Sequence, residues 1–412
     1  MIKILLISAG DVGHCVETTT NIQGALENYN CNVDTITPFA EILQGSKGFD
    51  YSIVTKDYKN GEKTLDNEQR YLQIYEIFLF LKKEYDLIFL VTLDEIFSLS
   101  DTLIQKLAGL FSGITVTGIY YGSSFWRDPD KVEWCKHREK KLTALKTKYA
   151  YSPDPFLSFV KDSKIPFQWL PDFTSILSDA SSLSLQNTLI QRKKGRKVVG
   201  LYGSLGKWKG ILEALDAFKH SPELSENYFL FLSGEIVWST FDEHEKTFLK
   251  DCLEKLQNVI LYYPYSIEST AGFNSLIDSC DIVLCFYNNL QSSGLVSKAI
   301  RKEKPLILSN KGFLKNLHSA FPETGISTSD IKTSLEILMR KPIPCSDNNF
   351  LLKHYRCMLT PEFAAQVILK DYFYLSNKGS YFENSDILLY FSKHSSWEFF
   401  EKTKALLSNS TG

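Results

Sequence analysis

Short apolar runs alternate with longer amphipathic stretches along most of this chain. Apolar runs of about four to eight residues without a polar alternation are typical of parallel strands that are buried on both faces. In the first half such runs occur at Ile2–Ser8, Asn32–Ile36, Asp86–Val91 and Ile114–Tyr121. Helical periodicity predicts helices at Cys15–Tyr29, Thr64–Lys83 and Lys131–Thr147. The order predicts an α/β, doubly wound, Rossmann-like domain with a parallel sheet.

The second half repeats the same alternation. The predicted strands are Lys197–Tyr202, Tyr228–Ser233, Val259–Tyr262, Ile282–Tyr287 and Leu306–Leu308. The predicted helices between them are Gly210–Lys219, Thr240–Gln257 and Ser266–Ser279, and 331–376 reads as mostly helical, with a last helix from Ser395 to Leu407. A second Rossmann-like domain with helices on both faces of its sheet is therefore expected.

The length of the chain fits this division, because a single core rarely serves more than about 250–300 residues and the chain has 412. Between the two series, a Ser-rich stretch and then a basic run lack a strand pattern, which predicts a linker. We expect an N-terminal domain over 1–170, a linker over 171–196, a C-terminal domain over 197–384, and a terminal helix and tail over 385–412.

Charge and cysteine content exclude several classes of protein. Lys and Arg total 46 against 48 Asp and Glu, so nothing in the bulk charge favours nucleic acid as a partner. The eight cysteines form no CxxC pair, which is typical of a reduced, cytoplasmic protein. No apolar run reaches the roughly 18 residues of a membrane span, although exposed aromatic side chains leave room for peripheral contact with a membrane.

One predicted helix carries a dense basic cluster. It could be a solvated helix face or a contact for anionic lipid or an acidic acceptor. The cluster consists of Lys136, His137, Arg138, Lys140 and Lys141.

Two turns of the second half have the chemistry of an anion site. Gly203–Gly210 follows a strand and precedes a helix, and it contains Ser204, Lys209 and three glycines. Ser292, Ser293 and Gly294 lie where the next crossover helix should begin, and free N–H groups at a helix N-terminus attract a phosphate. Both turns follow strands of one predicted sheet. They could hold a diphosphate between them, or be an exposed turn and a plain serine cap.

The first half offers weaker candidates for acid, base or sugar contacts. Gly10 and Asp11 end the first strand, and His14 could polarise an acceptor hydroxyl. Asp94 and Glu95 end another strand of that sheet, and in the second half Glu235 could contact sugar hydroxyls. The GxGxxG fingerprint is missing from both halves, which argues against a nicotinamide-dependent oxidoreductase.

The ordered set of motifs resembles the second domain of GT-B glycosyltransferases, particularly the large retaining, nucleotide-sugar-dependent family (family 4, group 1-like). The set comprises Gly203 to Lys209-Gly210, then NVILYYPY, then SCDIVLCFY, then SSGLVSKAIRKEKPLILSN, and finally SSWEFF. The resemblance covers most of 197–407, and 1–170 only in the order of elements. It implies two Rossmann-like domains that face a cleft, with a C-terminal helix that crosses back.

The resemblance also implies roles for individual residues. Lys209 would be the cation for the donor diphosphate, and Ser293, Gly294 and Leu295 would form the helix N-terminus that holds the distal phosphate, with Ser292 and Ser204 beside them. Tyr263, Pro264 and Tyr265 would lie near the nucleobase. Gly10 and Asp11 would approach the donor phosphates or the acceptor.

The chain departs from the family pattern at several positions. Ser204 stands where an arginine is common, and Lys298 stands where the second of two glutamates is common. No histidine occurs at 120–122. Lys298 could supply the missing positive charge or be a lysine on an outer helix face. Either the sugar is held differently, or the chain is a non-catalytic GT-B-like subunit that binds a sugar, a glycan or a partner glycosyltransferase.

The resemblance sets the chemical expectation. We expect transfer of a sugar from a nucleotide-diphosphate sugar, a UDP-sugar being slightly favoured, to a saccharide, a lipid-linked or a protein acceptor. Retention of configuration is favoured over inversion, and neither a metal ion nor another cofactor is expected. Such an enzyme would be cytoplasmic, with room for a peripheral position at the inner face of the membrane. Its oligomeric state does not follow from the sequence.

Overall fold

The structure is a computed structural model. It describes residues 1–10, 14–43, 48–57, 63–81, 84–154, 163–178, 182–264, 270–288, 293–340 and 350–375. Two compact units divide the chain: unit 1 comprises Met1–Thr174 with Met358–Gly412, and unit 2 comprises Ser175–Cys357. Each unit is described by itself.

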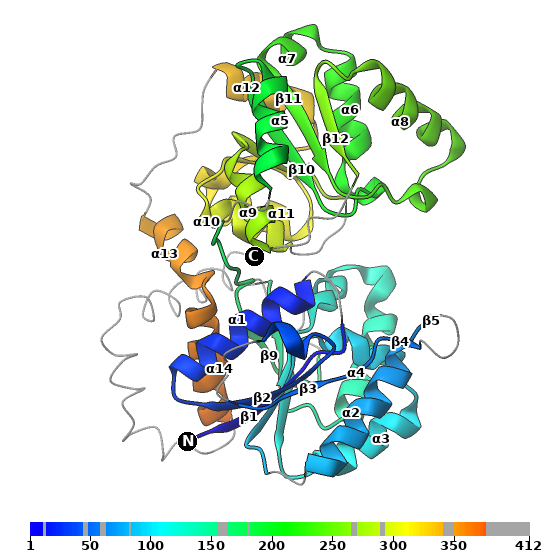
Figure 1. The fold of residues 1–412 in the computed structure, drawn as a ribbon, viewed down its shortest axis with the longest axis vertical. Coiled ribbons are helices and arrows are strands. Elements are labelled where there is room, and N and C mark those ends of the chain that lie inside the picture. Colours follow the sequence, from blue (N-terminus) through cyan, green and yellow to red (C-terminus); the bar gives the residue numbers. More distant parts are fainter. Residues whose placement is uncertain are drawn as a thin grey trace. The chain divides into compact units, whose positions relative to one another are not determined.

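In unit 1 the described residues form a parallel sheet of five strands, in the order β3-β2-β1-β6-β7 (Figure 1). The strands are β1 (Lys3–Ile7), β2 (Asn32–Thr37), β3 (Asp50–Ser52), β6 (Leu87–Leu90) and β7 (Thr115–Gly118). Two small pairs lie outside this sheet: the antiparallel β4 (Lys56–Asp57) and β5 (Lys63–Thr64), and the parallel β8 (Ala150–Ser152) and β9 (Phe167–Trp169). Every residue of β6 is buried, as the unbroken apolar run predicts.

Helices cover both faces of the unit 1 sheet. They are α1 (His14–Asn28), α2 (Asn67–Leu81), α3 (Asp101–Leu110), α4 (Val132–Ala144) and α14 (Pro361–Leu375). Tyr71 and Phe78 of α2 are buried in the core beneath one face, and Tyr75 packs against it, so the aromatic side chains of this helix face the core. On the other side α1 packs along α14 (Figure 1).

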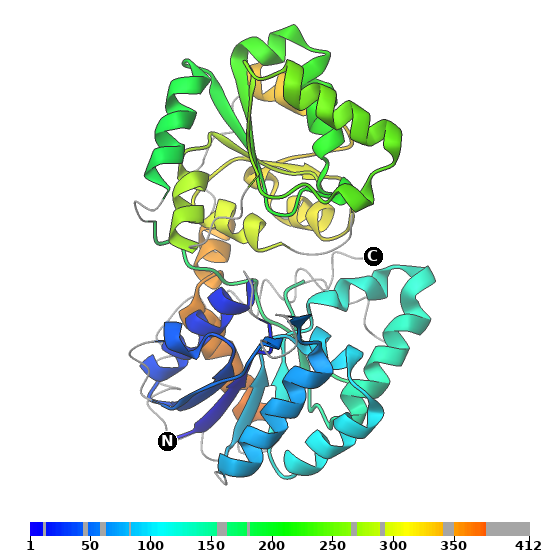
Figure 2. The ribbon, with the colours of Figure 1, turned by 45° about the vertical axis from the view of Figure 1, so that its right-hand side comes forward.

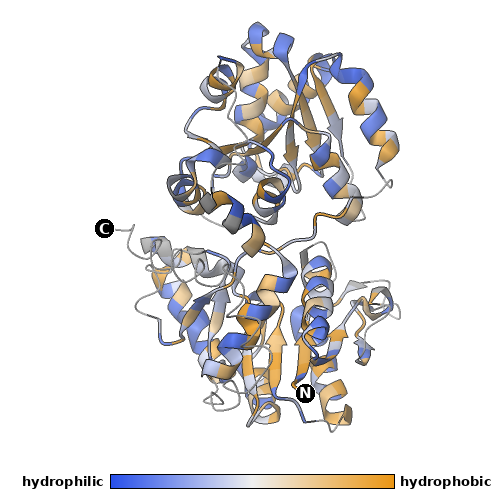
Figure 3. Cartoon of the chain, turned by 90° about the vertical axis from the view of Figure 1, so that its left-hand side faces the viewer, coloured by the Kyte–Doolittle hydropathy of each residue, from blue (hydrophilic) through white to orange (hydrophobic). Residues whose placement is uncertain are grey.

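Unit 2 contains a parallel sheet whose described strands number six, in the order β12-β11-β10-β13-β14-β15 (Figure 2). They are β10 (Lys197–Tyr202), β11 (Tyr228–Ser233), β12 (Ile260–Tyr263), β13 (Ile282–Cys285), β14 (Leu306–Ser309) and β15 (Gly325–Thr328). Figure 3 shows the apolar character of the strands in both units, in contrast to the mixed colouring of the helices.

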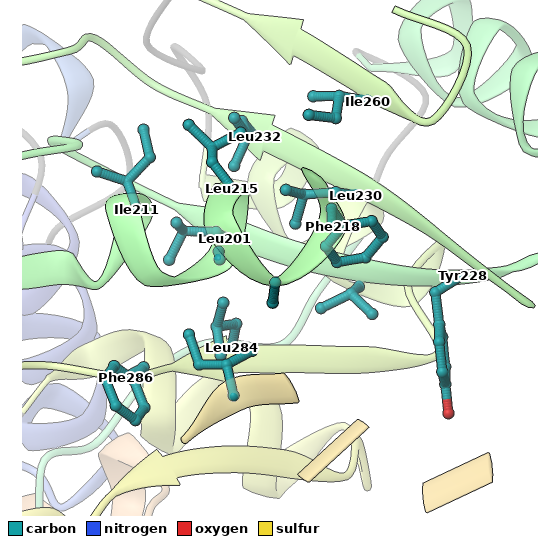
Figure 4. Packing of buried hydrophobic residues seen from close by; sticks show 14 of the residues in the cluster. Leu201, Ile211, Leu215, Phe218, Tyr228, Leu230, Leu232, Ile260, Leu284 and Phe286 are labelled. Atoms are coloured by element: carbon teal, nitrogen blue, oxygen red, sulfur yellow. The ribbon is translucent and has the colours of Figure 1, made fainter. Parts of the chain in front are cut away.

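The helices of unit 2 are α5 (Leu183–Lys193), α6 (Ile211–Lys219), α7 (Pro222–Asn227), α8 (Glu243–Lys255), α9 (Thr270–Asp278), α10 (Gly294–Arg301), α11 (Gly312–Ala320), α12 (Ile331–Arg340) and α13 (Phe350–Met358). One face of α6 fills the core against β10, β11 and β13, where Leu215 and Phe218 meet Leu201, Leu230 and Leu284 (Figure 4). This packing fixes the start of α6, and with it the preceding turn.

Two helices differ from the sequence prediction. The stretch predicted as part of a linker contains α5, whose Leu189 is buried and which contacts β11 in unit 2. The helix α14 was expected within the C-terminal domain, yet it packs on α1 in unit 1. The elements β3, α3, α7, α11 and β15 were not predicted from the sequence, and the helix expected at 395–407 lies outside the described residues.

Candidate functional site

The candidate site of unit 2 lies where the strand order of its sheet reverses. Strand β10 pairs with β11 on one side and with β13 on the other, and the chain continues outward in both directions. In parallel sheets such a switch point leaves a crevice beyond the carboxyl ends of the strands, where ligands bind. The turns that follow β10 and β13 are the two turns for which the sequence predicts an anion site.

The turn between β10 and α6 requires glycine at both ends. Gly203 has φ of 89° and Gly210 has φ of 73°, in the left-handed region that other residues avoid. A β-carbon on Gly210 would come within 2.5 Å of the Phe286 carbonyl oxygen, so the turn packs tightly on the residue that follows β13. The short helix η7 (Lys207–Lys209) between these glycines carries two lysines.

The two lysines have different surroundings. Lys207 is exposed and forms an ion pair with Glu245 at the start of α8. Lys209 is half-buried, and its Nζ lies 4.1 Å from the centre of the Tyr287 ring. Among the residues that the structure describes, no carboxylate pairs with Lys209. Burial lowers the pKa of Lys209 below its usual 10.5, because desolvation disfavours the ammonium form.

Tyr287 connects Lys209 to the second turn. Its hydroxyl lies 3.1 Å from the Ser293 Oγ, and Ser309 Oγ donates a hydrogen bond of 2.6 Å to its carbonyl oxygen. Ser293 is the N-cap residue of α10, with extended backbone angles, and its side chain makes no capping hydrogen bond. Tyr287 therefore contacts both the Lys209 ammonium and the N-cap residue of α10.

This arrangement suits an anion. The first N–H groups of a helix have no partner within the helix, and the helix dipole adds positive potential at that end. Gly294, as the first residue of α10, keeps the approach to the backbone open, while Leu295 is buried in the core. The Lys209 ammonium on the neighbouring turn, which pairs with no carboxylate among the described residues, adds a positive charge. A phosphate or diphosphate is the biological ligand that matches both features.

Other predicted donor-site residues lie around these turns. Ser204 and Glu235 are exposed, and the Glu235 carbonyl accepts a hydrogen bond of 2.8 Å from Leu205 N–H, which joins the turns after β10 and β11. Tyr263 ends β12 and is half-buried, and Pro264 after it is exposed. Lys298 is only 5% exposed, so it is not a lysine on an outer helix face. Ser292 and Tyr265 lie outside the described residues.

At the carboxyl edge of the unit 1 sheet, two neighbouring acidic side chains have different partners. The Asp94 carboxylate accepts hydrogen bonds from Tyr121 N–H (2.8 Å) and Gly122 N–H (3.0 Å). Glu95 accepts a hydrogen bond of 3.2 Å from the Tyr71 hydroxyl, and it lies against Gly10, where a β-carbon would come within 3.0 Å of Oε1.

Burial raises the pKa of both carboxyls. Asp94 reaches about 6 despite the two N–H donors, and Glu95 reaches about 7 despite the Tyr71 hydrogen bond and the nearby Arg70 guanidinium. Asp94 and Glu95 thus share one sheet edge, as expected from the topology, but their described contacts are to the protein itself. Asp11 lies outside the described residues, and His14 begins α1 with a side chain that is not described.

The basic cluster on α4 does not form one charged face. Arg138 stacks on Trp134, with 3.4 Å from its guanidinium carbon to the ring centre, and lies 3.7 Å from Asp94 Oδ1. Lys141 donates hydrogen bonds to the carbonyl oxygens of Phe97 and Leu99. The structure turns these two cations toward the protein and leaves Lys136, His137 and Lys140 exposed.

The sequence reasoning missed Tyr287 and its neighbour Asn288, which connect the two turns. The available signal was their position directly after a fully buried strand that leads into a phosphate-type turn. In the described ranges, no three His, Cys, Asp or Glu side chains gather where they could bind a metal ion. Among the described helices, none combines the length and the apolar character needed to cross a bilayer.

No protein-family model matches the sequence, and no curated protein matches it either. Solved structures do match over almost the whole chain. Sucrose-phosphate synthase from Thermosynechococcus elongatus gives a TM-score of 0.66 at 13% identity, covering 92% of this chain and 100% of that one. A UDP-forming trehalose-phosphate synthase from Burkholderia xenovorans gives 0.62 at 12% identity, covering 91% and 100%.

HepE of Anabaena, solved in complex with UDP and glucose, gives a TM-score of 0.60 at 12% identity, covering 90% of this chain and 99% of that one. At these identities the likeness establishes the fold. It confirms the fold class expected from the sequence, two Rossmann-like domains with parallel sheets, while membership of the retaining family 4 stays a prediction. The chain has the GT-B fold.

Proposed function

We propose that this protein is a glycosyltransferase that takes its sugar from a nucleotide-diphosphate donor bound at the switch point of unit 2. The observation that carries the proposal is the position of Lys209. Its ammonium has no acidic partner among the described residues and rests on Tyr287, whose hydroxyl meets Ser293 at the start of α10.

A cation without a counter-ion is costly in a half-buried position, where water solvates it incompletely. A bound diphosphate would supply the missing negative charge. Its distal phosphate would accept hydrogen bonds from the free N–H groups of α10, and the other phosphate would face Lys209. The nucleobase would lie toward Tyr263, Pro264 and Tyr265 at the end of β12, and Glu235 is a candidate contact for sugar hydroxyls.

In the transfer step, the bond between the anomeric carbon of the sugar and the diphosphate oxygen breaks, and a bond from that carbon to an acceptor hydroxyl oxygen forms. The diphosphate leaves with the bonding electron pair. Lys209 and the α10 N-terminus stabilise the negative charge that develops on it, which is where preorganised donors lower a barrier most. In a retaining reaction, which we favour, the leaving diphosphate accepts the proton of the acceptor hydroxyl.

A UDP-sugar is the favoured donor. Among the structural neighbours, HepE was solved with UDP-glucose and with UDP, and one trehalose-phosphate synthase is described as UDP-forming. The acceptor is a saccharide, a lipid-linked saccharide or a protein. We propose no metal ion for the diphosphate, since Lys209 and the helix N-terminus would provide its positive surroundings.

A non-catalytic GT-B-like subunit is the second candidate, and one observation favours it. Lys298 is buried in α10 at the position where the resemblance expects a glutamate, so a donor contact of the family would be altered. Such a protein would bind a nucleotide or a glycan without catalysing the transfer of a sugar.

Thermal unfolding with a panel of UDP-, GDP- and ADP-sugars tests the donor site. Stabilisation by at least one nucleotide sugar is expected, and its absence across the panel would rule out the donor site. Mass spectrometry of the same mixtures, with and without the saccharides of the host, then separates the two candidates. Release of nucleoside diphosphate identifies a transferase, whereas binding without turnover in every mixture identifies the non-catalytic subunit.

A further inference from the structure

Asn288 contacts three separate elements around the candidate donor site. Its backbone N–H donates a hydrogen bond of 2.8 Å to the carbonyl oxygen of Trp208, inside the turn that carries Lys209. Its side-chain Nδ2 donates a hydrogen bond of 3.0 Å to Glu213 Oε1 in the first turn of α6. Its Oδ1 accepts a hydrogen bond of 3.1 Å from Lys311 Nζ, beyond the end of β14.

The amide group suits this position because it presents a donor and an acceptor at the same time. A carboxylate at 288 would place like charges 3.0 Å apart beside Glu213, and an apolar residue would lose both partners. The two side-chain contacts come from segments that are 75 and 23 residues away in the sequence.

The neighbouring residue gives this network its importance for the site. The ring of Tyr287 lies under Lys209 and its hydroxyl lies beside Ser293. Because Asn288 follows Tyr287 directly in the chain, the hydrogen bonds of Asn288 also fix the position of Tyr287. Through its backbone bond to Trp208, Asn288 also fixes the distance from β13 to the turn of Lys209. The side-chain bonds to Glu213 and Lys311 add to this backbone connection in holding the two turns at their spacing.

We propose that Asn288 is a positioning residue for a nucleoside diphosphate: by bridging Glu213 and Lys311, it sets the spacing between the lysine of one turn and the helix N-terminus of the next. This inference rests on the proposed donor site, and it adds residues that touch no part of the donor. Two phosphates lie a fixed distance apart, so a site with a cation on one turn and N–H donors on another loses affinity when the turns separate.

The test is calorimetric titration of the full chain with UDP. Asn288→Ala is expected to weaken UDP binding about three- to tenfold, as the loss of one or two exposed hydrogen bonds to charged groups allows. Glu213→Ala should have a similar effect. Glu213→Gln should bind UDP as the wild type does, because its amide oxygen still accepts from Asn288. The double variant Asn288→Ala/Glu213→Ala should be no worse than Asn288→Ala alone, since that single variant already removes the bond to Glu213.

A control variant separates positioning from general stability. Asn227→Ala removes another exposed asparagine of unit 2, whose Nδ2 donates to the Glu223 carbonyl oxygen on α7, and it should leave UDP affinity unchanged. Unfolding temperatures of all variants are recorded beside the titrations, and the proposal requires that UDP affinity not follow them across the set.

The outcomes distinguish the two proposals. If wild-type protein binds UDP and Asn288→Ala binds it equally well, the positioning role is refuted while the donor site stands. Additive losses in the double variant, or failure of Glu213→Gln to retain affinity, would also refute the bridge. If the wild type binds neither UDP nor any nucleotide sugar, the donor site itself is refuted, and the positioning role fails with it.

Discussion

Replacement of Lys209 by alanine is the most direct perturbation of the proposed donor site. The variant removes the ammonium above the Tyr287 ring and leaves the glycines that shape the turn unchanged. In the free protein this ammonium has no acidic partner among the described residues, so its removal breaks no ion pair. The fold should therefore survive, so a loss of UDP affinity can be assigned to the missing ammonium.

The size of the effect follows from the contact that is lost. A hydrogen bond between a lysine ammonium and a phosphate is charge-assisted and contributes about 1.5–3 kcal/mol. At about 1.4 kcal/mol for each factor of ten, the dissociation constant of UDP should rise roughly 10- to 150-fold. The half-buried position favours the upper part of this range, because solvent screens the charge less than at the surface.

Calorimetric titration with UDP measures the change, and Lys207→Ala is the matched control. It removes the same charge two residues away, from a side chain that is exposed and paired with Glu245. An exposed ion pair contributes at most about 1 kcal/mol to stability, and UDP affinity should stay within about twofold of the wild type. Wild-type affinity in Lys209→Ala, or equal losses in both variants, would refute the assignment of Lys209 to the donor diphosphate.

Three further predictions concern stability. Lys209→Met should raise the unfolding temperature of the free protein at neutral pH, because burial lowers the pKa of Lys209 and the folded state therefore holds its ammonium at a cost. Calorimetry with and without UDP measures this, and a lower unfolding temperature would contradict the prediction. Glu95→Gln should stabilise the protein at pH 8 by on the order of 3 kcal/mol and change its stability little at pH 4, because the carboxyl has a pKa of about 7 when folded and near 4.5 when unfolded. Between these two pKa values the folded state binds more protons than the unfolded state, so the contribution of Glu95 to stability falls as pH rises through that window. Urea unfolding at both pH values should show that this pH dependence of the free energy of unfolding is lost in the variant. An unchanged pH dependence would contradict the prediction. Gly210→Ala should destabilise unit 2 by about 1–3 kcal/mol, because the residue has φ of 73° and its β-carbon would meet the Phe286 carbonyl oxygen; urea unfolding measures this, and a neutral effect would show that the turn can relax.

Local patterns were sufficient for most of the fold. Buried runs such as Leu87–Leu90 and Lys197–Tyr202 form strands close to their predicted bounds, because a short, unbroken apolar run is typical of a parallel strand that is buried on both faces. The short strand β3 was missed, because Asp50–Ser52 sits at the sheet edge and carries little apolar signal. The helix α5 was taken for a linker because its serines and basic residues hide a single buried leucine.

The candidate site could be predicted only in part. The glycines, Lys209 and the serines before α10 were recognisable, because a turn between a buried strand and a helix has a limited repertoire of residues. The contrast between Lys207 and Lys209 was not, since it depends on Glu245, which lies in another element and pairs with only one of them. Asn288 carried no motif at all.

The sequence by itself determined the alternation of strands and helices, the parallel sheets and the chemical character of the turns, because these depend on the spacing of apolar residues and on backbone preferences within a few positions. The tertiary structure alone decided which turns meet. Strand β10 lies beside β13 although about 80 residues separate them, and that neighbourhood places Lys209 over Tyr287 and Asn288 beside Glu213. It also placed α14 on α1, through packing between distant segments that no local pattern encodes.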